Sequence, residues 1–325
     1  MAFRNRLVFL FLLVMALSAV STLTWSWVSY GQTKHETEQM IVKAREQAAV
    51  PLNGLLRDVD NGLEYLSSLN VFPNPKSPEN KELDSAQAFF AAVHGSRLMA
   101  EAFDKQDRPK GEGSVFADGV PGPMIQALEQ AGRVGGPVLS VPFKLDGALF
   151  AAAVKAVKGE DGAQTGSVAV IFSVDEILDW WRMLKLPRGS AIALLSPEGV
   201  LWLRLPLEAG MIGKKVAKGP MMKVIVKAGT AQGLARIVPV NTDAVERYVG
   251  WQNLDYFGFR IVLGLSSDYM AEKWRGKYLM PLAVVVAVTA LAVRSMWRPW
   301  SVRKPKRRLG KAKKDSSRYS TPARP

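Results

Sequence analysis

Residues 190–204 have the sequence SAIALLSPEGVLWLR, in which two β-prone apolar runs flank the tetrapeptide SPEG. Pro197 presets the backbone φ of the first central turn position, and Gly199 supplies the positive φ with which the chain enters a second strand. The stretch therefore predicts a β-hairpin. Because both runs are apolar on both faces, we expect the hairpin to lie centrally in a covered sheet.

The net charge of +14 is concentrated at the two ends of the 325-residue chain. Arg4 and Arg6 stand at the start, and residues 294–325 hold twelve Lys/Arg and one acid, Asp315. Residues 7–293 carry only +1. Because no interleaved aromatic side chains or folded reader accompany the basic tail, we expect no nucleic-acid partner.

Two uncharged runs predict transmembrane helices. Leu7–Val28 has 22 residues, and a helix of that length covers roughly 30 Å, the thickness of the hydrocarbon core of a bilayer. The alternative is a signal peptide cleaved near residues 16–18. Tyr278–Val293 has only 16 residues, but Lys277 and Arg294 can extend a span by reaching the interface. The alternative for this run is a buried core helix.

The basic ends predict the topology, because Lys and Arg are enriched on the cytoplasmic side of membrane spans. Residues 29–277 are then extracytoplasmic, and the expected location is the plasma (inner) membrane. The chain has no cysteine, which suits a compartment where thiols oxidise. We expect the tail to bind anionic lipid at about 1 kcal/mol per charge. The alternatives are that the tail serves only to retain the topology, or that it is a docking site for a partner protein.

Residues 32–70 predict a long helix that follows the first span. Its second half carries apolar residues at spacings of three and four, which is one helical face; they are Leu52, Leu55, Leu56, Val59, Leu63 and Leu66. Pro51 is expected to kink or split the helix. We expect the apolar face to pack on a sheet, and the alternative is a dimer seam that rises from the membrane.

The remaining patterns predict two successive units of short strands and helices, which indicate an α+β fold with antiparallel sheets. The first unit has strands at 98–103 and 114–117, a helix at 121–133, and strands at 137–145, 148–157 and 166–173. The second has a helix at 175–184, the hairpin, a helix at 221–228, and strands at 233–240, 246–252 and 259–265. A helix from Asp268 then continues into the second apolar run.

Residues 188–277 resemble the membrane-proximal half of the double Cache (dCache) family of PAS-like extracytoplasmic sensor domains. The resemblance rests on RGSAIALL at 188–195, Arg204, IGKK at 212–215, ERYVGW at 246–251 and FRIVLGL at 259–265. It implies two tandem PAS-like (Cache) modules on a long N-terminal helix, flanked by two transmembrane helices. The implied divisions are a stub and first span (1–28), the long helix (29–70), a membrane-distal module (71–184), a membrane-proximal module (185–266), a helix continuing into the second span (267–297) and a basic disordered tail (298–325).

Members of this family usually continue after the second span into a signalling module, whereas about 30 polar residues follow here. The resemblance therefore implies a small-molecule sensor that signals through a separate cytoplasmic or membrane partner, with a homodimer as one arrangement. The alternative is an envelope scaffold that binds another protein and no small molecule. The sequence contains no phosphate-loop, zinc-protease or serine-hydrolase motif, and His35 and His94 have no ligand-spaced partner, so we expect neither an enzyme nor a cofactor or metal.

A ligand pocket is expected in the distal module, between its sheet and covering helix. The candidates combine an aromatic wall with charges that can pair with a small polar ligand; they are Phe103, Asp104, Phe116, Asp118, Phe143 and Lys144. Ordinary core and surface turns are the alternative. We expect the hairpin sheet to be a rigid link between that pocket and the helix that enters the membrane at Lys277.

Overall fold

The computed structural model describes residues 2–69, 81–94, 97–110, 114–116, 119–159, 161–208, 210–237 and 245–297. The candidate Asp118, residues 71–80 and the tail at 298–325 lie outside the described residues. The chain divides into two compact units: residues 25–277 form one, and residues 1–24 with 278–325 form the other.

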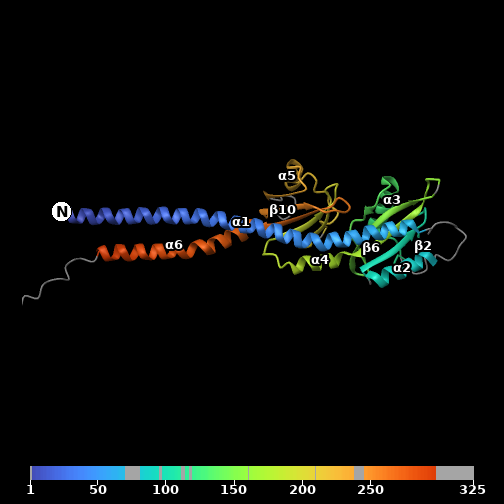
Figure 1. Cartoon of the computed structure of the whole chain (residues 1–325), viewed down its shortest axis with the longest axis horizontal. Helices are drawn as coiled ribbons and strands as arrows, with labels where there is room; N and C mark the ends of the chain where they lie inside the picture. The colour runs from blue at the N-terminus through green and yellow to red at the C-terminus, as the bar shows by residue number, and fades with distance from the viewer. Residues whose placement is uncertain are drawn as a thin grey trace, which may run out of the picture. The chain divides into compact units, whose positions relative to one another are not determined.

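Unit 25–277 contains two antiparallel sheets, both beside the long helix α1 (Ala2–Ser68) (Figure 1). The first sheet comprises β1 (Leu98–Phe103), β2 (Pro109–Lys110), β3 (Val138–Leu139), β4 (Phe143–Leu145), β5 (Ala148–Lys158) and β6 (Gln164–Ser173). The second comprises β7 (Ala191–Leu195), β8 (Leu201–Leu205), β9 (Gln232–Ile237), β10 (Arg247–Asn253) and β11 (Arg260–Ser266). The other helices are α2 (Lys81–His94), α3 (Gly122–Val134), α4 (Val174–Met183), α5 (Pro220–Ala228) and α6 (Ser267–Trp297).

The two sheets share one strand order. The first runs β2-β1-β6-β5-β3, with β4 also paired to β5, and the second runs β8-β7-β11-β10-β9. In each sheet the first strand lies between the second strand and the last one. The predicted mixture of helices and antiparallel sheets is therefore confirmed.

The apolar face of α1 forms the core of unit 25–277. Leu52, Leu56, Val59, Leu63 and Leu66 are fully buried in one cluster with strand residues of both sheets, whereas Leu55 is partly buried. The prediction that this face packs on a sheet is confirmed. The dimer seam along other parts of the helix stays a prediction.

Pro51 does not split α1, which is helical from Ala2 to Ser68. A proline inside a helix removes one backbone hydrogen bond and crowds the preceding turn. The neighbours Ala48 and Leu52 are buried against the sheets, so their packing holds the helix together across the missing bond. The predicted split was wrong because local propensity was outweighed by tertiary packing.

The hairpin at 190–204 is present as β7 and β8, and Gly199 has the expected positive φ of 74°. Its predicted central position is wrong, because β8 is the edge strand of its sheet. The outer edge of β8 is instead covered by the loop at 213–216. There the Gly213 N–H donates to the Leu201 carbonyl at 2.8 Å, and the Val216 N–H donates to the Gly199 carbonyl at 2.8 Å. A strand covered in this way is as apolar as a central one.

Two other strand predictions were wrong in the first sheet. Residues 114–116 form no strand, and the partner of β1 on that side is the short β2. The run at 137–145 is broken into β3 and β4. Pro137 and Pro142 have no N–H to donate to a ladder, and Ser140 uses its side-chain oxygen to accept from the Ala152 N–H at 3.0 Å.

Two of the described helices contain segments long and apolar enough to cross a membrane, in α1 from Phe9 and in α6 up to Leu291. The apolar window of each is exposed rather than packed inside the protein. The second run is therefore not a buried core helix. The choice between a retained first span and a cleaved signal peptide stays open.

Within unit 25–277, α1 contacts the first turns of α6. The Glu36 carboxylate accepts from Lys277 Nζ at 2.7 Å and lies 3.1 Å from Lys273 Nζ. The Trp274 ring meets Tyr30 edge-on, with ring centroids 6.1 Å apart. The two lysines lower the pKa of Glu36, with the hydrogen bond from Lys277 as the largest cause. The carboxylate therefore stays charged in mildly acidic solution. The ion pairs that it forms between α1 and α6 persist there as well.

Candidate functional site

The structure brings together the three aromatic residues expected in the distal pocket. Phe103 and Phe116 have ring centroids 5.9 Å apart, and Phe116 and Phe143 have centroids 6.2 Å apart. All three are buried in a cluster with residues of α3. They form a packed core between the first sheet and α3, and a ligand site there stays a prediction.

The charged candidates of the distal pocket lie apart from this core. The Asp104 carboxylate accepts from the backbone N–H of Gln106 and of Arg108 at 2.8 and 3.0 Å, and pairs with the Arg108 guanidinium at 2.8 Å. The Asp104 carboxylate therefore stabilises the turn at residues 104–108. Lys144 is exposed to solvent on β4.

Glu101 was missed by sequence reasoning although it lies on the same face of β1 as Phe103. Its side chain is 1% exposed, and Oε1 accepts from the Val115 N–H at 2.8 Å. Oε2 has no hydrogen-bond partner among the described residues. Burial raises the pKa of Glu101. The sequence signal that could have identified Glu101 was a single acid within the apolar strand LMAEAF. Strand alternation places this acid on the same face as Phe103.

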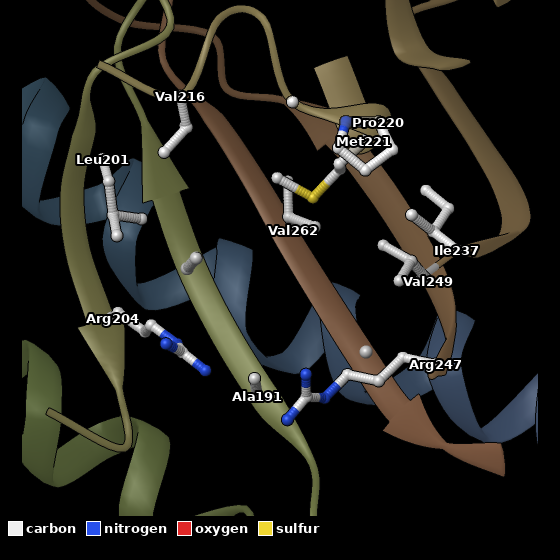
Figure 2. A pocket seen from close by; sticks show the side chains of 13 residues that line it. Ala191, Leu201, Arg204, Val216, Pro220, Met221, Ile237, Arg247, Val249 and Val262 are labelled. Carbon is white, nitrogen blue, oxygen red and sulfur yellow. The ribbon is translucent and has the colours of Figure 1, made fainter. Parts of the chain in front are cut away.

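A hollow lies on the face of the second sheet that is turned away from α1 (Figure 2). Its volume is about 80 Å³, which is room for a few water molecules or a small ligand. Strands of the sheet form the floor, and the segment leading into α5 forms one wall. We call this the arginine hollow; its lining residues are Ala191, Ala193, Leu201, Arg204, Val216, Gly219, Pro220, Met221, Ile237, Arg247, Val249, Val262 and Gly264.

The hollow exists because the sheet register places small residues in its middle. Ala191 pairs with Gly264 across β7 and β11, and Ala193 pairs with Arg204 across β7 and β8. A Cβ atom at Gly264 would come within 2.8 Å of the Arg247 Cδ. Glycine therefore leaves space for the stem of Arg247 to lie over the strand.

Two buried arginines point into the hollow. Arg204 of β8 and Arg247 of β10 are each 4% exposed, and Figure 2 shows their guanidinium groups approaching from two sides with Ala191 between them. Arg204 Nη1 pairs with Glu208 Oε1 at 2.7 Å. Arg247 Nε donates to the Gly189 carbonyl at 2.9 Å. The hollow thus combines apolar walls with two guanidinium groups, which stay protonated, and Glu208 offsets the charge of Arg204.

The start of α5 adds to this positive potential. The helix begins at Pro220 after an N-cap at Gly219 that supplies no side-chain hydrogen bond, and both residues line the hollow. The first turn of a helix carries a partial positive charge. We find no group of three metal-ligating side chains within the described ranges.

No family model matches the chain, and no curated protein sequence matches it. Solved structures do. The extracellular domain of the histidine kinase candidate rpHK1S-Z16 superposes with a TM-score of 0.56 at 14% identity, over 73% of this chain and 97% of that one. The periplasmic sensory domain of the Campylobacter jejuni chemoreceptor Tlp1 gives 0.55 at 12% identity, over 74% and 98%. The extracellular domain of soHK1S-Z6, a second kinase candidate, gives 0.53 at 14% identity, over 75% and 98%.

The fold is therefore one found in extracytoplasmic sensor domains of chemoreceptors and histidine kinases. The neighbours are sensor and receptor domains rather than enzymes. At this identity the likeness concerns the fold, and function is argued from the site.

Proposed function

We propose that this chain is a membrane-anchored extracytoplasmic sensor of the dCache type, which binds a small molecule and signals through a separate cytoplasmic partner. The observation that carries the proposal is the pair of sheets with one strand order on a shared helix, in a chain with two exposed apolar helices. The described architecture fits two PAS-like modules, the distal one built on β1–β6 and the proximal one on β7–β11.

The signal would travel through the direct connection between the second sheet and α6. Strand β11 ends at Ser266 and α6 begins at Ser267 without a linker. The Ser267 N–H donates to the Glu246 carbonyl at 2.9 Å, next to β10. A ligand that binds one arrangement of this sheet better than another would therefore shift the position of α6.

Thermal unfolding of the purified full chain in lipid nanodiscs, measured against a library of metabolites, tests the proposal. A ligand at 100 times its Kd stabilises the folded state by about 2.7 kcal/mol, which raises Tm by several degrees. We expect at least one compound to do so. If none does, and crosslinking in cells recovers a stoichiometric envelope protein instead, the scaffold alternative is favoured.

A further inference from the structure

We propose that a cleft between the two sheets of unit 25–277 binds an organic cation, an amine with an apolar or aromatic body. We call it the inter-sheet cleft; its volume is about 290 Å³. This inference rests on the proposed sensor function and adds the chemical class and the place of the ligand. The cleft differs from the distal site expected from the sequence and from the arginine hollow, where protein groups already engage both guanidinium groups.

The two walls of the inter-sheet cleft come from different sheets. One wall combines the end of α3 with β3 and its neighbours, between residues 130 and 141. The other combines residues between 196 and 202 of the hairpin with Phe257 and Phe259, which lie between β10 and β11. The volume is close to the lower end of ordinary ligand pockets, about 300 Å³. A ligand in the cleft would contact both sheets at once.

Most of the lining is apolar or aromatic. Val134, at the end of α3, is 63% exposed. The opposite sheet contributes three aromatic rings, of which Trp202 and Phe259 are buried and meet edge-on with ring centroids 5.5 Å apart. The third ring, that of Phe257, is partly buried. Such a lining gains from covering the apolar body of a ligand, and the faces of aromatic rings attract cations.

Phe257 has an unfavourable backbone conformation at this cleft. Its φ is 56°, in the left-handed region that bulky side chains rarely adopt. Gly258, the next residue, has a φ of 66° and adopts the same region at little cost. Strained residues of this kind are concentrated at ligand sites, where the surrounding structure holds them in place. The strain therefore supports a role for the Phe257 ring in the cleft.

Glu198 gives the inter-sheet cleft a negative charge. Among the described residues that line the cleft, it alone is charged. Its Oε2 accepts from the Ser196 hydroxyl at 2.7 Å, and no Lys or Arg of the described ranges forms an ion pair with it. Lys215 bridges to Val200 but does not line the cleft. A carboxylate with one neutral donor can still accept from an ammonium group, so charge complementarity favours a cation.

Phe259 connects the inter-sheet cleft to α6. It directly precedes β11, and α6 begins at the residue after β11. The Leu254 N–H donates to the Phe259 carbonyl at 2.8 Å, which fixes this residue to the end of β10. A ligand that binds one position of Phe259 better than another would therefore act on the strand that leads into α6.

Isothermal titration of the full chain in nanodiscs of zwitterionic lipid tests the inference, with empty nanodiscs as the control for uptake of amines by lipid. The ligands are 2-phenylethylamine and benzyltrimethylammonium. 2-Phenylethanol is the uncharged control, 3-phenylpropionate the anionic control, and methylammonium a cation without an apolar body. We expect at least one of the two aromatic cations to bind at least about 10-fold more tightly than any control.

Two variants make the result specific to the inter-sheet cleft. Glu198→Gln removes the charge, keeps an acceptor for the Ser196 hydroxyl and should weaken cation binding by about 10-fold. Val134→Trp fills the cleft from α3 and should abolish binding. Matched controls are Glu272→Gln on α6 and Val226→Trp on α5, which do not line the cleft and should leave Kd unchanged. All four positions are exposed, so we expect every variant to fold.

The failures of the two proposals are distinguishable. Binding that Val134→Trp abolishes, but that is equally tight for 2-phenylethanol or unchanged by Glu198→Gln, would overturn the cation class and keep the sensor function. Binding that neither variant changes would overturn this site. If neither aromatic cation binds while a library compound stabilises the chain, only this inference is overturned. Absence of any ligand in both experiments would overturn both proposals.

Discussion

Glu101 is a buried carboxylate whose pKa is raised by burial above its ordinary value of about 4.5. A raised pKa means that the folded protein binds this proton more readily than the unfolded chain does. Folding stability therefore increases as the pH falls from the folded pKa towards 4.5, and the cost of the buried charge is fully present above the folded pKa.

We expect Glu101→Gln to raise Tm at pH 7 and to remove this part of the pH dependence, because glutamine keeps an acceptor for the Val115 N–H. Thermal unfolding of both proteins between pH 4.5 and 8 measures it. The control is Glu129→Gln, which changes an exposed acid on α3. An equal pH dependence in the wild type and Glu101→Gln would contradict the expectation.

Trp202 joins the two sheets. Its Nε1 donates to the Ser140 carbonyl at 2.7 Å, and its ring lies 5.5 Å from the Phe259 ring and 6.2 Å from the Phe172 ring. Trp202→Ala should lower the free energy of unfolding by about 3–5 kcal/mol, measured by urea unfolding. Val226→Ala, on the exposed face of α5, should change it by less than about 0.5 kcal/mol. Similar effects of the two substitutions would show that Trp202 does not hold the sheets together.

At the scale of elements, α1 packs against both sheets. Substitutions on its buried face and on its exposed face should therefore differ in their effect on stability. Leu56 is fully buried, so Leu56→Ala should cost about 2–5 kcal/mol of unfolding free energy. Val50 is 71% exposed on the same helix, so Val50→Ala should be nearly neutral in the monomer. A large loss of stability with Val50→Ala that depends on protein concentration would instead favour the dimer seam.

Elements with strong local signals could be predicted from the sequence. The strand at Leu98–Phe103 has its predicted bounds, and the hairpin follows from the SPEG turn. The edge position of β8 could not be predicted, because the loop that covers it is apparent only in three dimensions. The break between β3 and β4 did have a sequence signal, because Pro137 and Pro142 have no N–H to donate to a ladder.

The arginine hollow shows why the candidate site was harder to predict than the fold. Arg204 and Arg247 are 43 residues apart in the numbering, and strand order brings them to one face through β7 and β11. Small residues such as Ala193 and Gly264 give no chemical signal in a sequence, yet they create the space. The aromatic cluster of Phe103, Phe116 and Phe143 was predictable as a group but lies in a packed core.

At the scale of the whole molecule, the proposed function requires residues 29–277 to lie outside the membrane and the basic tail inside. The chain has no cysteine, so single substitutions provide clean labelling sites. Val226→Cys places a thiol on an exposed position of α5. Ser316→Cys places one in the tail, where twelve Lys/Arg between residues 294 and 325 predict a cytoplasmic location.

Labelling of these two variants with a membrane-impermeant maleimide in intact cells tests the extracytoplasmic location of the sensor unit most directly. We predict that Val226→Cys is labelled in intact cells, and that Ser316→Cys is labelled only after the inner membrane is opened. Labelling of Ser316→Cys in intact cells together with protection of Val226→Cys until the cells are opened would contradict the account, because the folded unit would then face the cytoplasm.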